Sequence, residues 1–105
     1  MTDAPIKIAP TLESLRARRD EILTLAEKYG GYDVRIFGSV ARGDATPESD
    51  VDFLMRFHEW VSLYELAGIG QDLQELLEWN VDFVEDHAGL RERFRKRIMK
   101  DVVAL

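Results

Sequence analysis

Two aspartates separated by one residue, Asp50 and Asp52, are the side chains whose type and spacing most clearly indicate chemistry. They open the segment 51–57, where apolar and polar residues alternate as they do in a β-strand. Side chains two positions apart on a strand point to the same face, so the two carboxylates are expected to lie side by side. Close carboxylates repel each other unless a cation lies between them. The pair therefore predicts a site for Mg²⁺, a hard cation that binds oxygen ligands.

A third aspartate, Asp82, lies within Asn80-Val81-Asp82-Phe83-Val84, a short apolar segment that predicts another strand. A charged side chain in the middle of a strand is unusual and indicates a specific role. If this strand is a neighbour of the 51–57 strand, Asp82 can join the first two carboxylates. Three carboxylates can hold two metal ions roughly 3.5–4 Å apart, which clamp the attacking and leaving oxygens of an in-line displacement.

Residues suited to phosphate binding come before the aspartate pair. Gly38 and Ser39 follow a predicted strand over 33–37. A glycine lets the backbone approach a phosphate closely, successive N–H groups can form an anion-binding nest, and the Ser39 hydroxyl adds a donor. Arg42 can place its guanidinium on a phosphate oxygen. The aspartate pair alone is a weak signal, but Gly-Ser, ten residues and then Asp-x-Asp form a much rarer combination.

An amphipathic helix is predicted before the first strand. Thr11 is a suitable N-cap, apolar residues recur at helical spacing as far as Tyr29, and two glycines then end the helix. Residues 1–10 are interpreted as a flexible lead-in. Residues 38–49, which are rich in glycine and small polar side chains, predict a loop or a loop with one helical turn.

A second amphipathic helix is predicted between the two strands that carry aspartates. Ser62 and Glu65 have the spacing of a capping box at its start. Trp60 and Trp79, which flank this helix, are interpreted as packing residues. The apolar stripe of the helix is interpreted as core and consists of Leu63, Leu66, Ile69, Gly70, Leu73, Leu76 and Leu77.

The third strand is predicted over 79–85, and a last helix then runs to the end of the chain. Apolar residues repeat every four positions in this helix, at Leu90, Phe94, Ile98 and Val102. The element order predicts an α/β fold of the α+β type, with a small mixed sheet of about three strands and helices packed against it. One domain over 11–105 fits this length.

Composition narrows the classes of function. Cysteine is absent from the 105 residues, which excludes disulfides, thiolate metal sites and cysteine nucleophiles. The net charge of −6 argues against a general nucleic-acid binder. We find no signal peptide and no apolar run of membrane-spanning length, so a cytoplasmic protein with no membrane partner is expected. His58 and His87 have no ligand partner at metal spacing and are interpreted as surface or loop residues.

Basic residues are concentrated in the segment 91–100, which holds six of them and only one acidic residue, Glu92. Two interpretations stay open. The segment is either a solvated helix face, or a basic wall beside a phosphate site or an acidic partner. The six basic residues are Arg91, Arg93, Arg95, Lys96, Arg97 and Lys100.

The motif around the aspartate pair resembles that of a known superfamily. Gly38-Ser39-Val40-Ala41-Arg42-Gly43 followed by Ser49-Asp50-Val51-Asp52 is similar to the signature of the DNA polymerase β-like nucleotidyltransferases. The short chain and the Leu90-Arg91-Glu92-Arg93 segment resemble the minimal nucleotidyltransferase (MNT) branch. The resemblance covers about residues 34–100. It implies a palm-like nucleotidyltransferase core.

The resemblance also implies roles for individual residues. Asp50 and Asp52 would bind Mg²⁺, two ions in all, and Asp82 would complete the metal site and help activate the acceptor hydroxyl. Gly38 and Ser39 would hold the triphosphate of ATP, and Arg42 matches the same pattern.

Proteins of the MNT branch are commonly paired with a HEPN ribonuclease toxin, and they act as antitoxins by adding AMP to a toxin tyrosine. The resemblance therefore implies a protein adenylyltransferase that forms a hetero-oligomer with a HEPN-type toxin. Two alternatives stay open: transfer to a small hydroxyl compound such as an aminoglycoside, and a catalytically silent antitoxin that acts by binding. The complete set of three aspartates favours the two enzymes.

Overall fold

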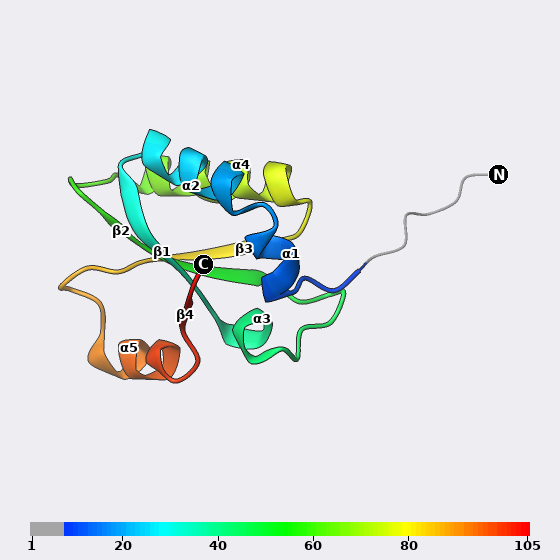
Figure 1. Cartoon of the computed structure of the whole chain (residues 1–105). Helices are drawn as coiled ribbons and strands as arrows, with labels where there is room; N and C mark the ends of the chain where they lie inside the picture. The colour runs from blue at the N-terminus through cyan, green and yellow to red at the C-terminus, as the bar shows by residue number, and fades with distance from the viewer. Residues whose placement is uncertain (1–7) are drawn as a thin grey trace.

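The computed structural model describes residues 8–105 and contains a four-stranded mixed sheet in the order β3-β2-β1-β4 (Figure 1). Strand β1 pairs with β2 and with β4 in antiparallel fashion, whereas β2 and β3 are parallel. The strands are β1 (Gly31–Phe37), β2 (Val51–Phe57), β3 (Val81–Glu85) and β4 (Val103–Ala104). The mixed sheet is confirmed, with one strand more than the sequence predicts.

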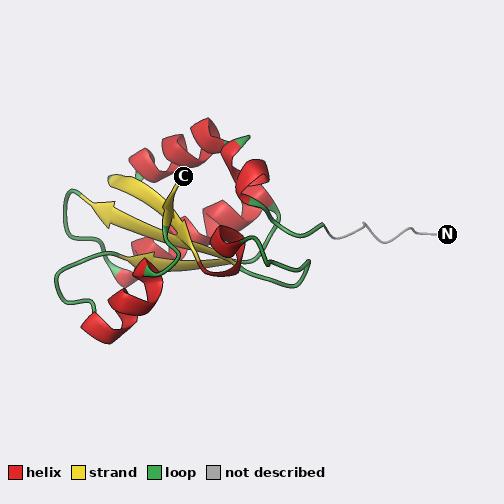
Figure 2. Cartoon of the chain, turned by 60° about the horizontal axis from the view of Figure 1, so that its bottom comes forward, coloured by secondary structure: helices red, strands yellow, loops and turns green. Residues whose placement is uncertain are grey.

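Helices cover both faces of this sheet. Helices α2 and α4 lie on one face and α5 lies on the other, as two views of the chain show (Figures 1 and 2). The helices are α1 (Leu12–Arg16), α2 (Arg19–Lys28), α3 (Gly38–Arg42), α4 (Leu63–Leu77) and α5 (Glu92–Met99). The α/β architecture with helices packed against the sheet is therefore confirmed.

The main core lies between the sheet and the helices α1, α2 and α4. Val51, Phe53 and Met55 alternate along β2, and all three are fully buried in this core. Leu54 points to the opposite face and is also fully buried, on the side where α5 lies. Because β2 is covered on both faces, only Asp52 and Arg56 among its inner residues are polar.

The first helix of the prediction is two helices in the structure. The chain leaves helical geometry at Arg18, whose φ is −112° and ψ is 21°. The Arg18 guanidinium donates a hydrogen bond to the Leu76 carbonyl at the end of α4 (2.5 Å) and pairs with Glu21 (3.0 Å). The prediction of one continuous helix was wrong because periodicity cannot show this contact with α4, which is distant in sequence.

The chain ends in a strand, and the predicted terminal helix stops at Met99. Val103 pairs with Ile36 at the free edge of β1, and the Leu105 N–H donates to the Val34 carbonyl (3.1 Å). The four-residue apolar repeat suggested a helix as far as Val102. The chain forms a strand here instead, because the edge of β1 is free to pair and β-branched residues such as Val103 favour strands.

The middle helix is confirmed, with two corrections to its predicted core stripe. A Cβ at Gly70 would meet open space, so Gly70 does not face the core. Ser62 accepts the predicted capping bond from the Glu65 N–H (3.1 Å), and Ile69, Leu73 and Leu77 are buried. Leu63 is 85% exposed, so its assignment to the core was wrong. It occupies the first turn of the helix, before the point where α4 packs on the sheet.

The two tryptophans differ. Trp79 packs against the core, and its indole N–H donates to the Ile8 carbonyl (2.8 Å), as a packing residue should. Trp60 is 85% exposed, so the prediction that it packs was wrong. The predicted lead-in, residues 1–10, lies outside the described residues except for its last three, of which Pro10 is buried. No helix within 8–105 is long and apolar enough to cross a membrane.

Candidate active site

The parallel pairing of β2 and β3 brings the predicted carboxylates together. Asp52 lies directly opposite Asp82 in the register of the two strands. Asp50 precedes β2, and the fully buried Val51 between the two aspartates turns both carboxylates away from the core. The neighbouring strands on which the prediction for Asp82 depended are therefore present. Asp52 is half-buried, whereas Asp50 and Asp82 are exposed.

Helix α4 explains why the strands are parallel. It carries the chain from the end of β2 back to the end where β2 begins, so that β3 starts beside Val51. The Val51 N–H donates to the Asn80 carbonyl at this point (2.8 Å). A helical crossover of this kind is the usual connection between parallel strands, and here it places both aspartate-bearing segments at one end of the sheet.

The pKa of Asp52 is raised to about 6, well above its ordinary value of 3.8, and burial is the largest cause. The negative charges of Asp82, Asp50 and Asp101 contribute to this shift, and the Arg42 guanidinium opposes it. Burial and the neighbouring negative charges both disfavour the charged carboxylate. A cation at this position would have the opposite effect, so the site is electrostatically suited to bind one.

The described side chains do not form a closed metal cage. The Asp82 carboxylate accepts a hydrogen bond from the Phe83 N–H (3.1 Å), and within residues 8–105 no three acidic or histidine side chains converge on one point. Mg²⁺ does not require such a cage, because it takes one or two carboxylates and completes its shell with water and phosphate oxygens. The donor set of Asp50 and Asp52 fits that requirement.

Gly38 lies directly against the Asp52 carboxylate. Its φ of +75° is in the left-handed region, and a Cβ at this position would overlap an oxygen of the Asp52 carboxylate. Both facts require glycine here. Helix α3 begins at this residue, so the half-buried Ser39 lies in its first turn, next to the acidic site. The structure therefore brings the Gly-Ser motif and the aspartate pair together.

Arg42, at the end of α3, pairs with two carboxylates. Its Nε lies 3.3 Å from Asp44 and its Nη1 lies 2.7 Å from Asp101. The Gly38 N–H also donates to Asp101 (3.1 Å). Sequence reasoning missed Asp101, because it lies 63 residues from Gly38 and no motif marks it.

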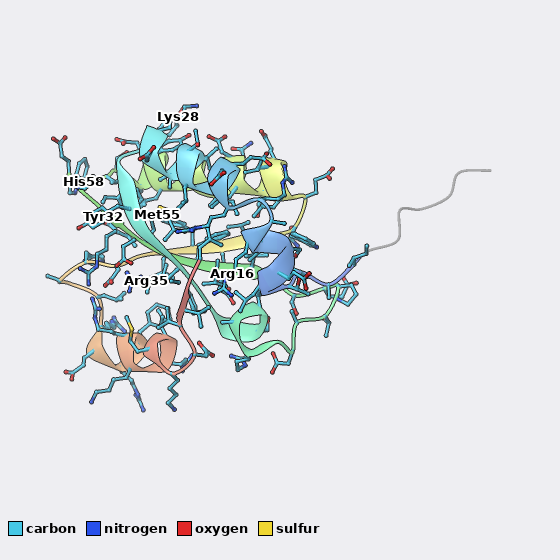
Figure 3. The ribbon with its side chains drawn as sticks, in the orientation of Figure 1. Arg16, Lys28, Tyr32, Arg35, Met55 and His58 are labelled. Atoms are coloured by element: carbon cyan, nitrogen blue, oxygen red, sulfur yellow. The ribbon has the colours of Figure 1, made fainter. Side chains whose placement is uncertain are left out.

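The basic segment 91–100 is divided in the structure. Arg95 turns inward and pairs with Asp86, a carboxylate whose side chain is 1% exposed. Arg35 and Arg56 contact the same carboxylate at 2.7 and 3.2 Å (Figure 3 labels Arg35). Arg91, Arg93, Arg97 and Lys100 are exposed, and Lys96 pairs with Glu92 (3.5 Å).

Both histidines are exposed, as the sequence predicts. His58 stacks on Tyr32 with ring centroids 4.3 Å apart, and Figure 3 shows the two side chains together at one end of the sheet. His87 accepts a hydrogen bond from the Gly89 N–H (3.0 Å). These contacts give each histidine a local structural role.

The structure is thus an α/β protein in which a glycine turn, the carboxylate of Asp52 and a carboxylate on the neighbouring parallel strand lie at one end of the sheet. The chain belongs to the nucleotidyltransferase domain family, which it matches over residues 19–105. Its enzyme class is therefore nucleotidyltransferase.

Known proteins support this assignment. The chain is 35% identical over 79 residues to the protein adenylyltransferase MntA of Thermococcus cleftensis, covering 75% of this chain and 79% of that protein. A solved structure assigned as a minimal nucleotidyltransferase is 41% identical, with a TM-score of 0.77 and coverage of 91% and 97%. A tri-AMPylated Shewanella oneidensis HEPN toxin in complex with an MNT antitoxin matches with a TM-score of 0.66 at 14% identity, covering 85% of this chain and 69% of that one. The last match shows a shared fold.

Proposed function

We propose that this chain is a Mg²⁺-dependent protein adenylyltransferase of the antitoxin type, which transfers AMP from ATP to a tyrosine of a HEPN-type toxin. One observation carries the proposal. Asp52 lies opposite Asp82 on parallel strands and against the Gly38 turn, so that two carboxylates lie beside the start of helix α3. The identity to MntA and the shared fold with an MNT antitoxin support the acceptor class.

Asp50 and Asp52 would hold Mg²⁺, and Asp82, opposite Asp52 on β3, would complete the acidic site. When bound, the metal neutralises charge on the phosphates and on the attacking and leaving oxygens. The chain itself would orient the triphosphate. The Ser39 hydroxyl and N–H and the Arg42 guanidinium are donors on α3, and Gly38 lets the phosphates approach the backbone.

Transfer would form a bond between the tyrosine oxygen of the acceptor and the α-phosphorus of ATP. The bond from that phosphorus to the bridging oxygen of the β-phosphate breaks, and pyrophosphate leaves. Asp82 would accept the proton of the tyrosine hydroxyl, since it lies opposite Asp52 and its carboxylate is exposed. Such a base must lie within hydrogen-bond reach of that hydroxyl.

A protein acceptor agrees with a second surface, which we name the apolar patch: Trp60, Leu63 and Tyr64. These side chains are 85%, 85% and 89% exposed and lie within five residues of one another. Exposed clusters of large apolar side chains mark interaction surfaces. The patch follows the end of β2, whereas Asp50 and Asp52 lie at its start. A partner held at the patch therefore leaves the acidic site open to another part of that partner.

The test is the mass of a HEPN-type toxin incubated with catalytic amounts of this protein, ATP and Mg²⁺. We expect each toxin molecule to gain adenylyl groups, with many toxin molecules modified per molecule of enzyme. Asp82→Ala should abolish the gain, and Glu75→Ala, an exposed change on α4, should not. A toxin that is fully inhibited but unmodified would instead show that the protein acts by binding alone.

A further inference from the structure

Asp101 occupies a position that the proposed mechanism does not use. It lies in the turn between α5 and β4, and its side chain is only 18% exposed. One carboxylate oxygen accepts the Gly38 N–H (3.1 Å), and the other accepts from Nη1 of Arg42 (2.7 Å). A single side chain thus contacts two of the groups assigned to the triphosphate site.

The segment that carries Asp101 is held firmly. Strand β4 pairs with Arg35 and Ile36, the last residues of β1 before Phe37 and the Gly38 turn. The Arg16 guanidinium donates to the Ala104 carbonyl (2.7 Å), which ties β4 to α1 (Figure 3 labels Arg16). These contacts therefore hold Asp101 in place beside the Gly38 turn.

The Gly38 turn has little to hold it in place by itself. Its left-handed conformation presses it against Asp52, and helix α3 of only five residues follows it. A short helix contributes little stability of its own. The hydrogen bond from the Gly38 N–H to Asp101 restrains the turn, and so helps to determine where α3 begins.

Arg42 is restrained by the same carboxylate. Half of this side chain is exposed, and Asp44 and Asp101 hold its Nε and Nη1. A guanidinium has five N–H donors in a rigid plane, so donors remain for a phosphate. Fixing the plane in advance lowers the entropy that a ligand would otherwise have to remove.

We propose that Asp101 is a positioning residue for the triphosphate, acting through the Gly38 turn and the Arg42 guanidinium. The proposal rests on the proposed function and names a residue outside its motif. Asp101 itself would not touch the nucleotide. Its negative charge is opposed at 2.7 Å by Arg42, so restraint outweighs its repulsion of phosphate.

The test is calorimetry with Mg²⁺ and α,β-methylene-ATP, in which the bond broken by nucleotidyl transfer cannot be cleaved. Asp101→Asn keeps an acceptor for Gly38 but loses the ion pair with Arg42. We expect affinity to fall about tenfold, the range for loss of a charge-assisted contact. Affinity for AMP, which lacks the β- and γ-phosphates, should stay within about twofold, whereas a general structural defect would weaken both ligands. Asp101→Glu should restore part of the loss.

Two further variants complete the test. Glu92→Gln makes the same charge change on α5 at an exposed position that pairs with Lys96, and it should not alter affinity. In an Arg42→Ala background, Asp101→Asn should have a smaller effect. Unchanged or tighter ATP-analogue binding by Asp101→Asn would overturn the role of Asp101 alone. Wild-type protein that binds no analogue would contradict the proposed function, and the role of Asp101 with it.

Discussion

Asp52 and Asp86 are both shielded from water, but their surroundings give them opposite chemistry. Asp52 faces other carboxylates, and burial together with those charges raises its pKa to about 6. Burial would raise the pKa of Asp86 too, but hydrogen bonds from Arg35, Arg95 and Arg56 outweigh it and lower the pKa to about 2. Asp86 is thus a carboxylate neutralised by arginines, whereas most of the charges that act on Asp52 are negative. That contrast separates the candidate site from the rest of the charged surface.

Asp52→Asn should stabilise the metal-free protein at pH 7.5. The folded pKa of Asp52 lies above its ordinary value, so the folded state binds the proton more tightly than the unfolded state does. The free energy of unfolding of the wild type therefore falls as pH rises from about 4 to about 6, and the full penalty remains above that range. Urea denaturation in EDTA should show the variant more stable at pH 7.5 and equal to the wild type below about pH 4.

Mg²⁺ provides the complementary measurement. Added Mg²⁺ should raise the urea midpoint of the wild type at pH 7.5 and have little effect on Asp52→Asn, because binding to the folded state alone stabilises it. Glu27→Gln, an exposed change on α2, serves as the control for a simple loss of charge. Equal Mg²⁺ stabilisation of wild type and Asp52→Asn would remove Asp52 from the metal site.

Asp86→Asn should destabilise the fold by about 3 kcal/mol, because it leaves three arginines close together around a buried position without their counter-charge. Asp33→Asn is a matched control: this carboxylate contacts two of the same arginines but is 44% exposed, so it should cost less than about 1 kcal/mol. Because the pKa of Asp86 is lowered, its stabilisation is complete above about pH 4 and disappears as pH falls toward 2. Equal losses in the two variants at pH 7 would contradict this account.

At the scale of elements, the sequence pattern predicted the helices and strands whose bounds depend on neighbouring residues, and it failed where a bound depends on a contact distant in sequence. Strand β2 has the predicted bounds, because its alternation reflects one buried face throughout. The break at Arg18 and the pairing of β4 depend on partners far away in the chain, Leu76 and Ile36, which no window of sequence contains. The same reason applies to the candidate site. The Asp-x-Asp motif can be recognised within a few residues, whereas Asp101 reaches the site only through the fold.

Helix α4 offers a direct test of this difference between pattern and position. Leu63 and Leu73 belong to the same predicted stripe, yet Leu63 is 85% exposed and Leu73 is fully buried. Leu73→Ala should lower the free energy of unfolding by about 2–5 kcal/mol through the lost contacts and the cavity left behind. Leu63→Ala should change it by less than about 0.5 kcal/mol. Urea denaturation of the two variants measures both, and comparable losses would mean that Leu63 is packed in solution.

At the scale of the whole molecule, charge and apolar surface are separated. The segment 91–100 holds six of the 14 basic residues of a chain whose net charge is −6, and most of the six are exposed. The apolar patch lies beyond the end of β2, flanked by Glu59 and Glu65. Strand β2 has seven residues, so the patch and the aspartate pair are separated by roughly 20 Å at the usual rise per residue. A partner that meets both ends must be a macromolecule.

The two surfaces should therefore affect association with a HEPN-type toxin in different ways. Trp60→Ser with Tyr64→Ser removes apolar contacts that are made only after docking, so the dissociation rate should rise by about tenfold or more. Arg93→Glu with Arg97→Glu alters long-range attraction, so the association rate should change and its dependence on salt should alter, with little effect on dissociation. Surface plasmon resonance at two salt concentrations measures both rates. All four residues are exposed, so circular dichroism should be unchanged in each double variant.

If the apolar patch anchors the toxin, adenylylation by the Trp60/Tyr64 variant should recover at high toxin concentration, since the acidic site is intact. Dissociation at the wild-type rate would instead show that the toxin binds elsewhere, and the exposed aromatic residues would then need another partner.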